Sequence, residues 1–193
     1  MSENTDVTLL NYNDEVHTNI WDDLLNALIS VAKGLENIHA YGSIHRNFHC
    51  GNILVHYWNE FLIGGLRLCQ PSSQIDKKQV YGVLPYIAPE VLREKKIIRA
   101  SDIYGFGIIA YEVLTGMPPY YDIAHDELLA LKICQGLRPK SDYKIPQLIF
   151  DVIKRCWDAN PSNRPNANEL CNSLNNLERN LDENNEETVA VKD

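Results

Sequence analysis

Hydrophobic residues recur at helical spacing early in the chain, and the clearest run predicts a helix over residues 21–41. Asp22 and Asp23 stand in its first turn, where acidic side chains favour the positive end of the helix dipole. Gly42 follows as a stop signal. The apolar positions of this helix are Leu24, Leu25, Leu28, Val31, Leu35 and Ile38.

A second helix is predicted over residues 103–114 and is hydrophobic almost all round. Ser101 or Asp102 supplies its N-cap, and Gly116 ends it together with the prolines that follow. Because this helix has no polar face to turn toward water, we expect it to lie at the centre of the fold.

The C-terminal part of the chain predicts further helices over residues 124–135 and 146–157. Asn166 and Glu169 have the spacing of a capping box and mark the start of a last helix. From residue 179 to residue 193 the composition turns to Asp, Glu and Asn, which predicts a disordered acidic tail.

Short apolar runs separate the first two helices. Residues 53–55 and 61–63 flank a polar turn and predict a short β-hairpin. The polar residues 44–52 before them are predicted to form a loop that presents side chains. Residues 64–87 predict a long exposed segment, and residues 1–20 predict a lead-in loop or short helix. The predicted fold class is mainly α.

The composition is typical of one soluble globular domain, since the chain has 193 residues, of which 45% are hydrophobic and 23% charged. The net charge of -8 disfavours nucleic acid and anionic membranes as main partners. The longest apolar run is too short to span a bilayer, and the acidic start of the chain excludes a secretory signal. We therefore expect a cytoplasmic protein.

The cysteines and glycines raise two further candidates for chemistry. The five cysteines are scattered and form no C-x-x-C pair, so neither a zinc site nor a disulfide framework is predicted. His45, His49 and Cys50 lie close together but match no zinc-ligand spacing. Gly105 and Gly107 fit a dinucleotide-binding pattern, yet a helix cap and not a strand precedes them, which favours close helix packing.

Residues 45–52, His-Arg-Asn-Phe-His-Cys-Gly-Asn, resemble the catalytic loop of protein kinases, His-Arg-Asp-x-x-x-x-Asn. Further motifs follow in the family's order. Residues 88–90 match the Ala-Pro-Glu that closes the activation segment, and residues 101–107 resemble the start of the family's central helix. Residues 156–165 resemble the final loop of tyrosine-kinase-like domains. The resemblance covers residues 21–178 and implies the C-terminal lobe of a protein kinase.

The resemblance implies that Asn47 replaces the Asp that accepts the proton of the substrate hydroxyl. A neutral amide can hydrogen-bond a hydroxyl but cannot take its proton. Asn52 keeps the Mg²⁺-ligand position of the loop, and Asn52 and Leu54 are the candidates for contact with a nucleotide. His45 and Arg46 complete the catalytic-loop positions.

The family's Asp-Phe-Gly triplet, whose Asp holds Mg²⁺, corresponds to Gly65, Leu66 and Arg67. Gly65 has no side chain to bind a metal, and Val83 stands where the family has a Thr hydroxyl. The N-terminal β-lobe, with its Gly-rich loop and Lys, is expected to be absent, because no such motif precedes the first helix. We therefore expect a pseudokinase-like site without a cofactor, which binds ATP and Mg²⁺ only if activity remains.

The resemblance also assigns structural roles. Asp102 is expected to hydrogen-bond the backbone around His45 and Arg46, and Glu90 is expected to pair with Arg164. The positions assigned to the family's apolar spine are His45, Leu54 and Leu66.

Ser72, Ser73 and Tyr81 lie in the segment that phosphorylation orders in active relatives, with Arg46 as the partner of the phosphate. They are therefore candidate phosphorylation sites. The alternative is that all three are simply exposed residues of a loop.

The leading prediction is an inactive kinase-like module that binds an unidentified protein in signalling, through residues 64–87 and 124–135. One alternative is a residual Ser/Thr/Tyr protein kinase that borrows an N-terminal lobe from another chain and uses ATP. Another is a gene fragment that folds poorly, because its upper face exposes apolar surface.

Overall fold

The computed structural model of the protein describes residues 7–8, 20–56, 60–73, 81–140 and 145–190. The helices are α1 (Ile20–Ala40), α2 (Pro89–Glu94), α3 (Arg99–Thr115), α4 (Glu127–Cys134), α5 (Gln147–Cys156) and α6 (Ala167–Ala190). The strands are β1 (Val7–Thr8), β2 (Ser43–Ile44), β3 (Ile53–His56), β4 (Glu60–Ile63) and β5 (Gln70–Pro71). Short 3₁₀ turns are η2 (Cys50–Asn52), η4 (Leu66–Leu68), η5 (Leu84–Tyr86) and η6 (Pro161–Asn163). The protein is mainly helical with small antiparallel sheets, which agrees with the predicted class.

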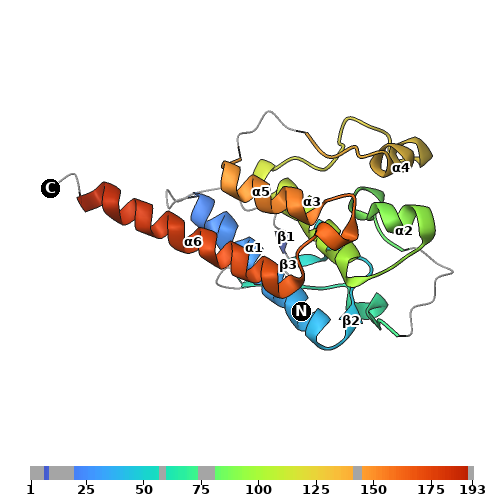
Figure 1. Cartoon of the computed structure of the whole chain (residues 1–193), viewed down its shortest axis with the longest axis horizontal. Coiled ribbons are helices and arrows are strands. Elements are labelled where there is room, and N and C mark those ends of the chain that lie inside the picture. The colour runs from blue at the N-terminus through green and yellow to red at the C-terminus, as the bar shows by residue number, and fades with distance from the viewer. Residues whose placement is uncertain (1–6, 9–19, 57–59, 74–80, 141–144, 191–193) are drawn as a thin grey trace, which may run out of the picture.

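Helix α3 lies at the centre of the fold, as its lack of a polar face predicts (Figure 1). Residues 102–112 are all buried. A Cβ atom at Gly105 would lie 2.9 Å from the carbonyl oxygen of Phe48, and one at Gly107 would lie 2.9 Å from the Cβ of Cys156. Neighbouring segments therefore pack directly on the α3 backbone. Close packing, and not dinucleotide binding, explains these glycines.

The start of α3 differs from the prediction. The helix begins at Arg99, and Ser101 is its third residue, whose hydroxyl accepts a hydrogen bond from the backbone N–H of Ile98 at 3.3 Å. Asp102 bonds to another part of the chain and does not cap the helix. The N-cap is Ile98. Ser101 lies three residues after it, inside the helix, and Asp102 bonds to His45 and Arg46, a contact that the local sequence pattern cannot reveal. Gly116 ends the helix at φ 65°, as predicted.

Helices α1 and α6 run side by side (Figure 1). The bounds of α1 agree with the predicted helix over residues 21–41 to within one residue. The capping box of α6 is confirmed, since Asn166 N–H donates to Glu169 Oε2 at 3.0 Å and Glu169 N–H donates to Asn166 Oδ1 at 2.9 Å.

The C-terminal end of α6 differs from the predicted disordered tail of residues 179–193. The helix continues to Ala190, and residues 191–193 lie outside the described residues. Residues 179–190 contain neither Gly nor Pro, and a helix that has already formed extends at the cost of fixing one residue per added hydrogen bond. Composition alone therefore underestimated how far this helix extends.

Strands β3 and β4 form the predicted hairpin, and β1 adds to the outer edge of β3 to give the order β1-β3-β4. This sheet packs against α1, where a Cβ atom at Gly34 would lie 2.9 Å from the Cδ1 of Ile63. Part of the predicted lead-in loop is therefore a strand. Residues 1–6 and 9–19 lie outside the described residues.

The segment of residues 64–87 contains more structure than predicted. Strand β5 pairs antiparallel with β2, while η4 and η5 form turns on either side of residues 74–80, which lie outside the described residues. Pro85 is buried and its neighbours are half-buried. Pairing between two-residue strands depends on backbone groups and leaves no periodic pattern in the sequence, so the pattern could not predict it.

Helix α4 is shorter than the predicted helix over residues 124–135, because Asp126 caps it by accepting hydrogen bonds from the backbone N–H groups of Leu128 and Leu129. Helix α5 agrees with the predicted 146–157 to within one residue. Within the described ranges, every helix is too short or too polar to cross a bilayer.

Candidate functional site

Asp102 on α3 holds the backbone of residues 45–52, called loop 45–52 from here on. Its Oδ2 accepts from His45 N–H at 2.8 Å and its Oδ1 accepts from Arg46 N–H at 3.1 Å. Nε2 of His39 lies 2.9 Å from the same Oδ2. Arg46 has a φ of 72°, a left-handed conformation that a non-glycine residue keeps only where its surroundings enforce it. The buried carboxylate therefore fixes a strained turn, in the manner that the sequence resemblance implies.

His45 is fully buried beneath the loop. Its Nε2 lies 2.8 Å from the carbonyl oxygen of Gly64, and its Nδ1 accepts from the backbone N–H of Asn47 at 3.3 Å. These partners fit a ring whose proton is on Nε2, because an N–H can donate only to an unprotonated nitrogen. His45 thus connects loop 45–52 to the start of the following segment.

Glu90 on α2 and Arg164 form the predicted ion pair in the interior. The Nη1–Oε1 and Nη2–Oε2 distances are both 2.8 Å, and both side chains are buried. The hydroxyl of Ser101 donates to Glu90 at 2.9 Å, and Arg164 also donates to the carbonyl oxygens of Ala100 and Asp158. Both charges are thus paired and further hydrogen-bonded, which offsets the cost of removing them from water.

The side chain of Asn52 is tied within its own loop. Its Nδ2 donates to the carbonyl oxygen of Asn47 at 2.7 Å and lies 3.0 Å from Nε2 of His49. Burial and the nearby His45 lower the pKa of His49, which favours the neutral ring that can accept this hydrogen bond. Since an amide has only two N–H donors, Oδ1 is the atom of Asn52 that remains for a metal or ligand.

Gly65 lies directly against Asn52. Its φ is 70°, and a Cβ atom built on it would lie 2.5 Å from the Cγ and Nδ2 of Asn52 and 2.6 Å from its Oδ1. Any side chain at this position would therefore collide with the Asn52 amide. The two positions that resemble the family's metal-ligand positions exclude each other in this conformation.

The residues after Gly65 point outward. Leu66 is 52% exposed, so the expectation that it fills an apolar spine position is wrong. The left-handed turn at Gly65 leads into η4, which carries Leu66 and Arg67 to the surface. Leu54 is half-buried on β3, with its Cδ1 3.2 Å from a Cβ built on Gly64. His45 alone of the three predicted spine positions is fully buried.

Sequence analysis missed a buried polar cluster behind the loop. Glu112 on α3 accepts hydrogen bonds from the Tyr86 hydroxyl and the Cys50 thiol. Burial raises the pKa of Glu112, and burial together with the charge of Glu112 raises the pKa values of Tyr86 and Cys50. The available signal was an acidic residue inside an otherwise apolar helix. The cluster joins loop 45–52 to η5, and the Tyr86 ring lies 5.9 Å from that of His49.

Arg46 contacts the segment in which the candidate phosphorylation sites lie. Its Nη1 donates to Gln70 Oε1 at 2.6 Å, and its guanidinium carbon lies 5.7 Å from the ring centroid of Tyr81. Ser72 and Ser73 are both exposed, and the Ser72 hydroxyl donates to the carbonyl oxygen of Gly42, which directly precedes β2. Of the three candidates, the structure brings only Tyr81 into contact with Arg46 among the described contacts.

Asn47 is half-buried and lines a small pocket with Gly82 and Val83. The exposed isopropyl group of Val83 offers no hydroxyl to this pocket. In the described part of the chain, no group of three or more His, Cys, Asp or Glu residues is arranged to hold a metal ion. All five cysteines are free, which agrees with their scattered positions.

A family model described as protein tyrosine and serine/threonine kinase matches residues 8–174. The chain belongs to the protein kinase family. Loop 45–52 and residues 64–90 lie within this match, at the positions that resemble the family's catalytic loop and activation segment, and the two names are used for them below. The family transfers a phosphoryl group from ATP with the help of Mg²⁺.

Individual relatives agree with this assignment. A protein kinase and PP2C-like domain-containing protein of Oryza sativa is 28% identical over 89% of the chain. A probable serine/threonine-protein kinase of Dictyostelium discoideum and fibroblast growth factor receptor 1 of Xenopus laevis are each 31% identical over 80% of the chain. The chain spans only 32%, 10% and 20% of the lengths of these three proteins, in that order.

Proposed function

We propose that the chain is a pseudokinase-like C-terminal lobe that has lost phosphoryl transfer and acts by binding another protein in signalling. The observation that carries this proposal is the contact between Gly65 and Asn52. The position where the family holds Mg²⁺ with an Asp has no side chain here, and the Asn52 amide fills the space that a Cβ atom would need.

Proton transfer supports the same proposal. Asn47 stands at the position of the family's catalytic Asp, beside the pocket that it lines with Gly82 and Val83. Its amide can orient a hydroxyl but has no basic group near neutral pH. Loss of a general base typically lowers the rate about 10²- to 10⁴-fold. His49 does not replace it, because its Nε2 already accepts a hydrogen bond from Asn52.

The retained scaffold supports a role that needs a folded lobe. The bonds from Asp102 to loop 45–52 and the Glu90–Arg164 pair hold the loop and the end of the activation segment. We place the chain in the C-terminal lobe because its described helices and its kinase motifs follow that lobe's order.

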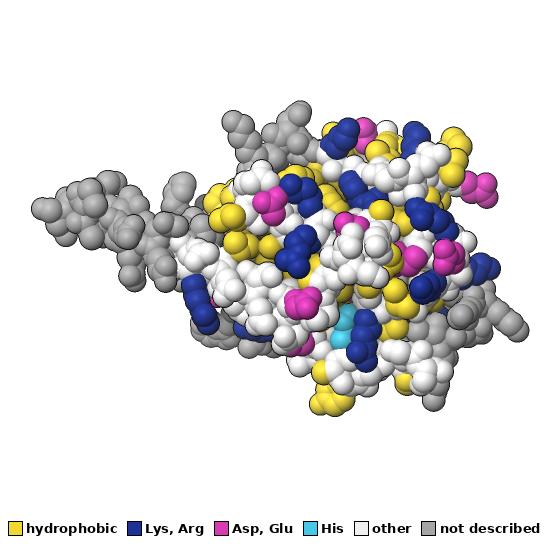
Figure 2. Space-filling view, viewed as in Figure 1, with side chains coloured by type: hydrophobic (Ala, Val, Ile, Leu, Met, Phe, Trp, Pro, Cys, Tyr) yellow, Lys and Arg dark blue, Asp and Glu magenta, His cyan; other side chains and the backbone are white. Residues whose placement is uncertain are grey.

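Helix α4 is one candidate binding surface. Leu128 and Leu131 are 66% and 55% exposed, and their spacing of three places them on one face of the helix. Hydrophobic side chains are visible at the surface over α4 in Figure 2. Tyr81 and Val83 in the activation segment are further exposed apolar residues, at 41% and 42%. Exposed apolar groups of this kind are common at protein-binding surfaces.

A second candidate function is a residual protein kinase that uses ATP after a second chain supplies an N-terminal lobe. Two observations favour it. Oδ1 of Asn52 remains available to bind a metal ion, and Asp102 still hydrogen-bonds the backbone of the catalytic loop.

Phosphoryl transfer tests the proposal. The purified chain is incubated with γ-labelled ATP, Mg²⁺ and a mixture of Ser, Thr and Tyr peptides, with Asn52→Ala as the matched control. We expect the label transferred by both proteins to stay at the background rate. Transfer by the wild-type chain that Asn52→Ala abolishes would contradict the proposal and support the residual kinase.

A further inference from the structure

The side chain of Arg46 contacts residues on both sides of the segment between Gln70 and Tyr81. Its Nη1 donates to Gln70 Oε1 at 2.6 Å, and its guanidinium lies over the ring of Tyr81 at 5.7 Å. Gln70 belongs to β5, and Tyr81 lies eleven residues further along the chain. One arginine side chain thus contacts two residues that are distant in sequence.

The backbone conformation of Arg46 sets the direction of this side chain. Its φ of 72° is strained for a non-glycine residue, and the Asp102 Oδ1 accepts its N–H at 3.1 Å. Asp102 is buried at 3% exposure, so solvent does not compete for this hydrogen bond. Strain of this kind persists only where surrounding contacts enforce it, and here it directs the guanidinium toward the activation segment.

Among the residues that the structure describes, the partners of the guanidinium are neutral. Gln70 offers an amide oxygen and Tyr81 an aromatic face, whereas a phosphate would take two N–H groups of an arginine in a fork. Nε of Arg46 is buried and has no hydrogen-bond partner among the described residues. Among the described residues, the arginine is therefore held by stacking on Tyr81 and by the amide of Gln70.

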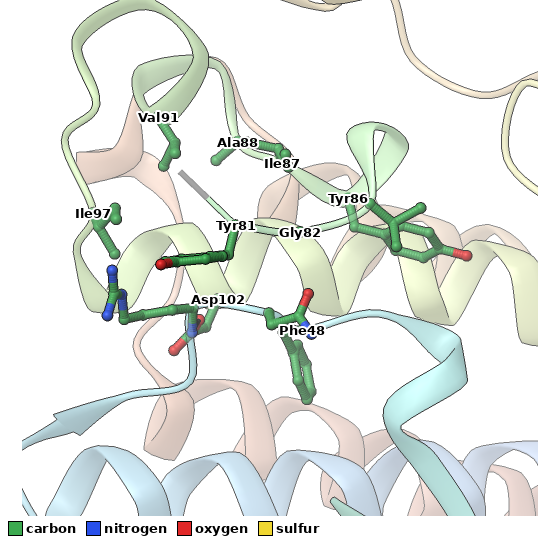
Figure 3. Close-up of a pocket in the computed structure, with 12 residues that line it drawn as sticks. Phe48, Tyr81, Gly82, Tyr86, Ile87, Ala88, Val91, Ile97 and Asp102 are labelled. Atoms are coloured by element: carbon green, nitrogen blue, oxygen red, sulfur yellow. Dashed lines mark hydrogen bonds between the residues drawn. The ribbon is translucent and has the colours of Figure 1, made fainter. Parts of the chain in front are cut away.

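Arg46 also lines a small pocket beside the Tyr81 ring. The pocket that it lines with Tyr81, Val91 and Ile97 has a volume of about 30 Å³, which is enough for roughly one or two water molecules. Figure 3 shows the Tyr81 ring at the edge of this pocket, with its hydroxyl end directed toward the side of Ile97. The Tyr81 ring thus covers one side of the guanidinium.

A second neutral contact fixes the β5 end of the segment. The backbone N–H and the hydroxyl of Ser72 both donate to the carbonyl oxygen of Gly42, at 3.0 and 2.9 Å. A phosphoryl group on Ser72 would replace the hydroxyl donor with acceptor oxygens against this carbonyl, which is unfavourable. Ser72 in its unmodified form therefore fits the described contacts.

We propose that Arg46, Gln70 and Tyr81 form a clasp that holds the activation segment against the catalytic loop without phosphorylation. The ring of Tyr81 and the amide of Gln70 take the place that a phosphate would need beside the arginine. The surface around Tyr81 and Val83 is then preformed in the unmodified protein. This inference concerns the order of the segment and holds whether or not the chain transfers phosphate.

Hydrogen exchange measured by mass spectrometry tests the clasp on the full chain, expressed in bacteria and shown by intact mass to be unphosphorylated. The variants are Tyr81→Phe, which keeps the ring, and Tyr81→Ala and Gln70→Ala, which each remove one arm. Tyr121→Ala is the matched control, because this tyrosine is 64% exposed and lies outside the clasp.

We expect the amides of residues 68–73 and 81–88 to be protected in the wild type, in Tyr81→Phe and in Tyr121→Ala. Because an exposed cation–π contact contributes about 0.5–1 kcal/mol, Tyr81→Ala should raise their exchange rates roughly two- to fivefold. Gln70→Ala should raise them in the same direction. The proposal is overturned if Tyr81→Ala exchanges like Tyr121→Ala. It is equally overturned if these amides are unprotected in the unmodified wild type and gain protection only after phosphorylation.

Discussion

The two sides of the catalytic loop differ in what they retain. On the inner side, Asp102 and His45 hold the loop through short hydrogen bonds, and Glu90 and Arg164 close a buried ion pair nearby. On the outer side, Asn47 has no basic group to take a proton and Gly65 no side chain to hold a metal. The inner side therefore keeps the contacts that support the fold, while these two outer positions depart from the family's pattern.

This difference indicates which properties each set of residues controls. The inner contacts are buried, so their removal should cost stability whatever the function is. The outer residues are half-buried or exposed, and restoring one of them should not restore a site while its neighbour occupies the same space. Substitutions on the two sides should thus have different consequences.

The largest expected loss comes from Arg164→Ala. This change leaves the carboxylate of Glu90 buried without its cation, and we expect the free energy of unfolding to fall by about 3–5 kcal/mol. Denaturant unfolding followed by circular dichroism measures the loss. Lys154→Ala serves as the control, because it breaks an exposed pair with Asp151 and should change little. Equal effects of the two changes would contradict the assignment of the inner side.

Gly65→Ala comes next, with an expected loss of about 2–4 kcal/mol, since a left-handed non-glycine residue and a steric collision each cost free energy. Gly116→Ala is a close control. That glycine has a φ of 65° but no atom within 4 Å of the added Cβ, so it reports the backbone cost alone. In an Asn52→Ala background, which already lacks the hydrogen bonds of that side chain, Gly65→Ala should cost only about as much as Gly116→Ala does in the wild type. If it does not, the Asn52 side chain does not block this position.

Asp102→Asn should cost about 2–3 kcal/mol, because hydrogen bonds to a charged acceptor are replaced by an amide that can accept at only one atom. Both backbone N–H groups of the strained turn depend on this carboxylate. Thermal unfolding of the variant beside the wild type gives the loss. Hydrogen exchange at Arg46 should rise in the same variant, and an unchanged rate there would argue against Asp102 as the anchor of the turn.

The smallest expected effect is the pH dependence that Glu112 contributes. Burial raises its pKa in the folded state above the ordinary 4.5, so above pH 4.5 the folded protein keeps a proton that the unfolded chain has released. The free energy of unfolding of the wild type should therefore fall, relative to Glu112→Gln, as the pH rises through this range. Denaturant unfolding of both proteins at a series of pH values from 4 upward measures the difference. If the free energies of unfolding of the two proteins change equally with pH, the pKa of Glu112 is not raised by folding.

The fold was largely predictable because its helices carry strong periodic signals. The bounds of α1 and α5 and the capping box of α6 followed from apolar spacing and from Asn166 and Glu169. The sequence did not predict the start of α3 or the β2–β5 pair, because both depend on hydrogen bonds that no periodic pattern reveals. It also did not predict the length of α6, because this helix continues through a polar stretch. Leu66 was misplaced because the turn at Gly65 departs from the family pattern that placed it.

The site was predictable in its chemistry and not in its geometry. The motif alone predicted Asn47, Asn52 and Gly65 as the positions on which activity depends, and this stays a prediction. It could not show that the Asn52 amide fills the space beside Gly65. Nor could it reveal the buried cluster of Cys50, Tyr86 and Glu112, whose members are distant in sequence and become partners only in the folded chain.

Nucleotide binding tests the central claim most directly, and a thermal melt of the purified chain measures it with and without millimolar ATP, each with and without Mg²⁺. A ligand at about 100 times its Kd stabilises a protein by about 2.7 kcal/mol, which shifts the melting temperature by roughly 2–4 °C for a domain of this size. We predict a cooperative melt whose midpoint ATP and Mg²⁺ leave unchanged. A Mg²⁺-dependent shift that Asn52→Ala removes would contradict the claim that this site has lost its metal and nucleotide.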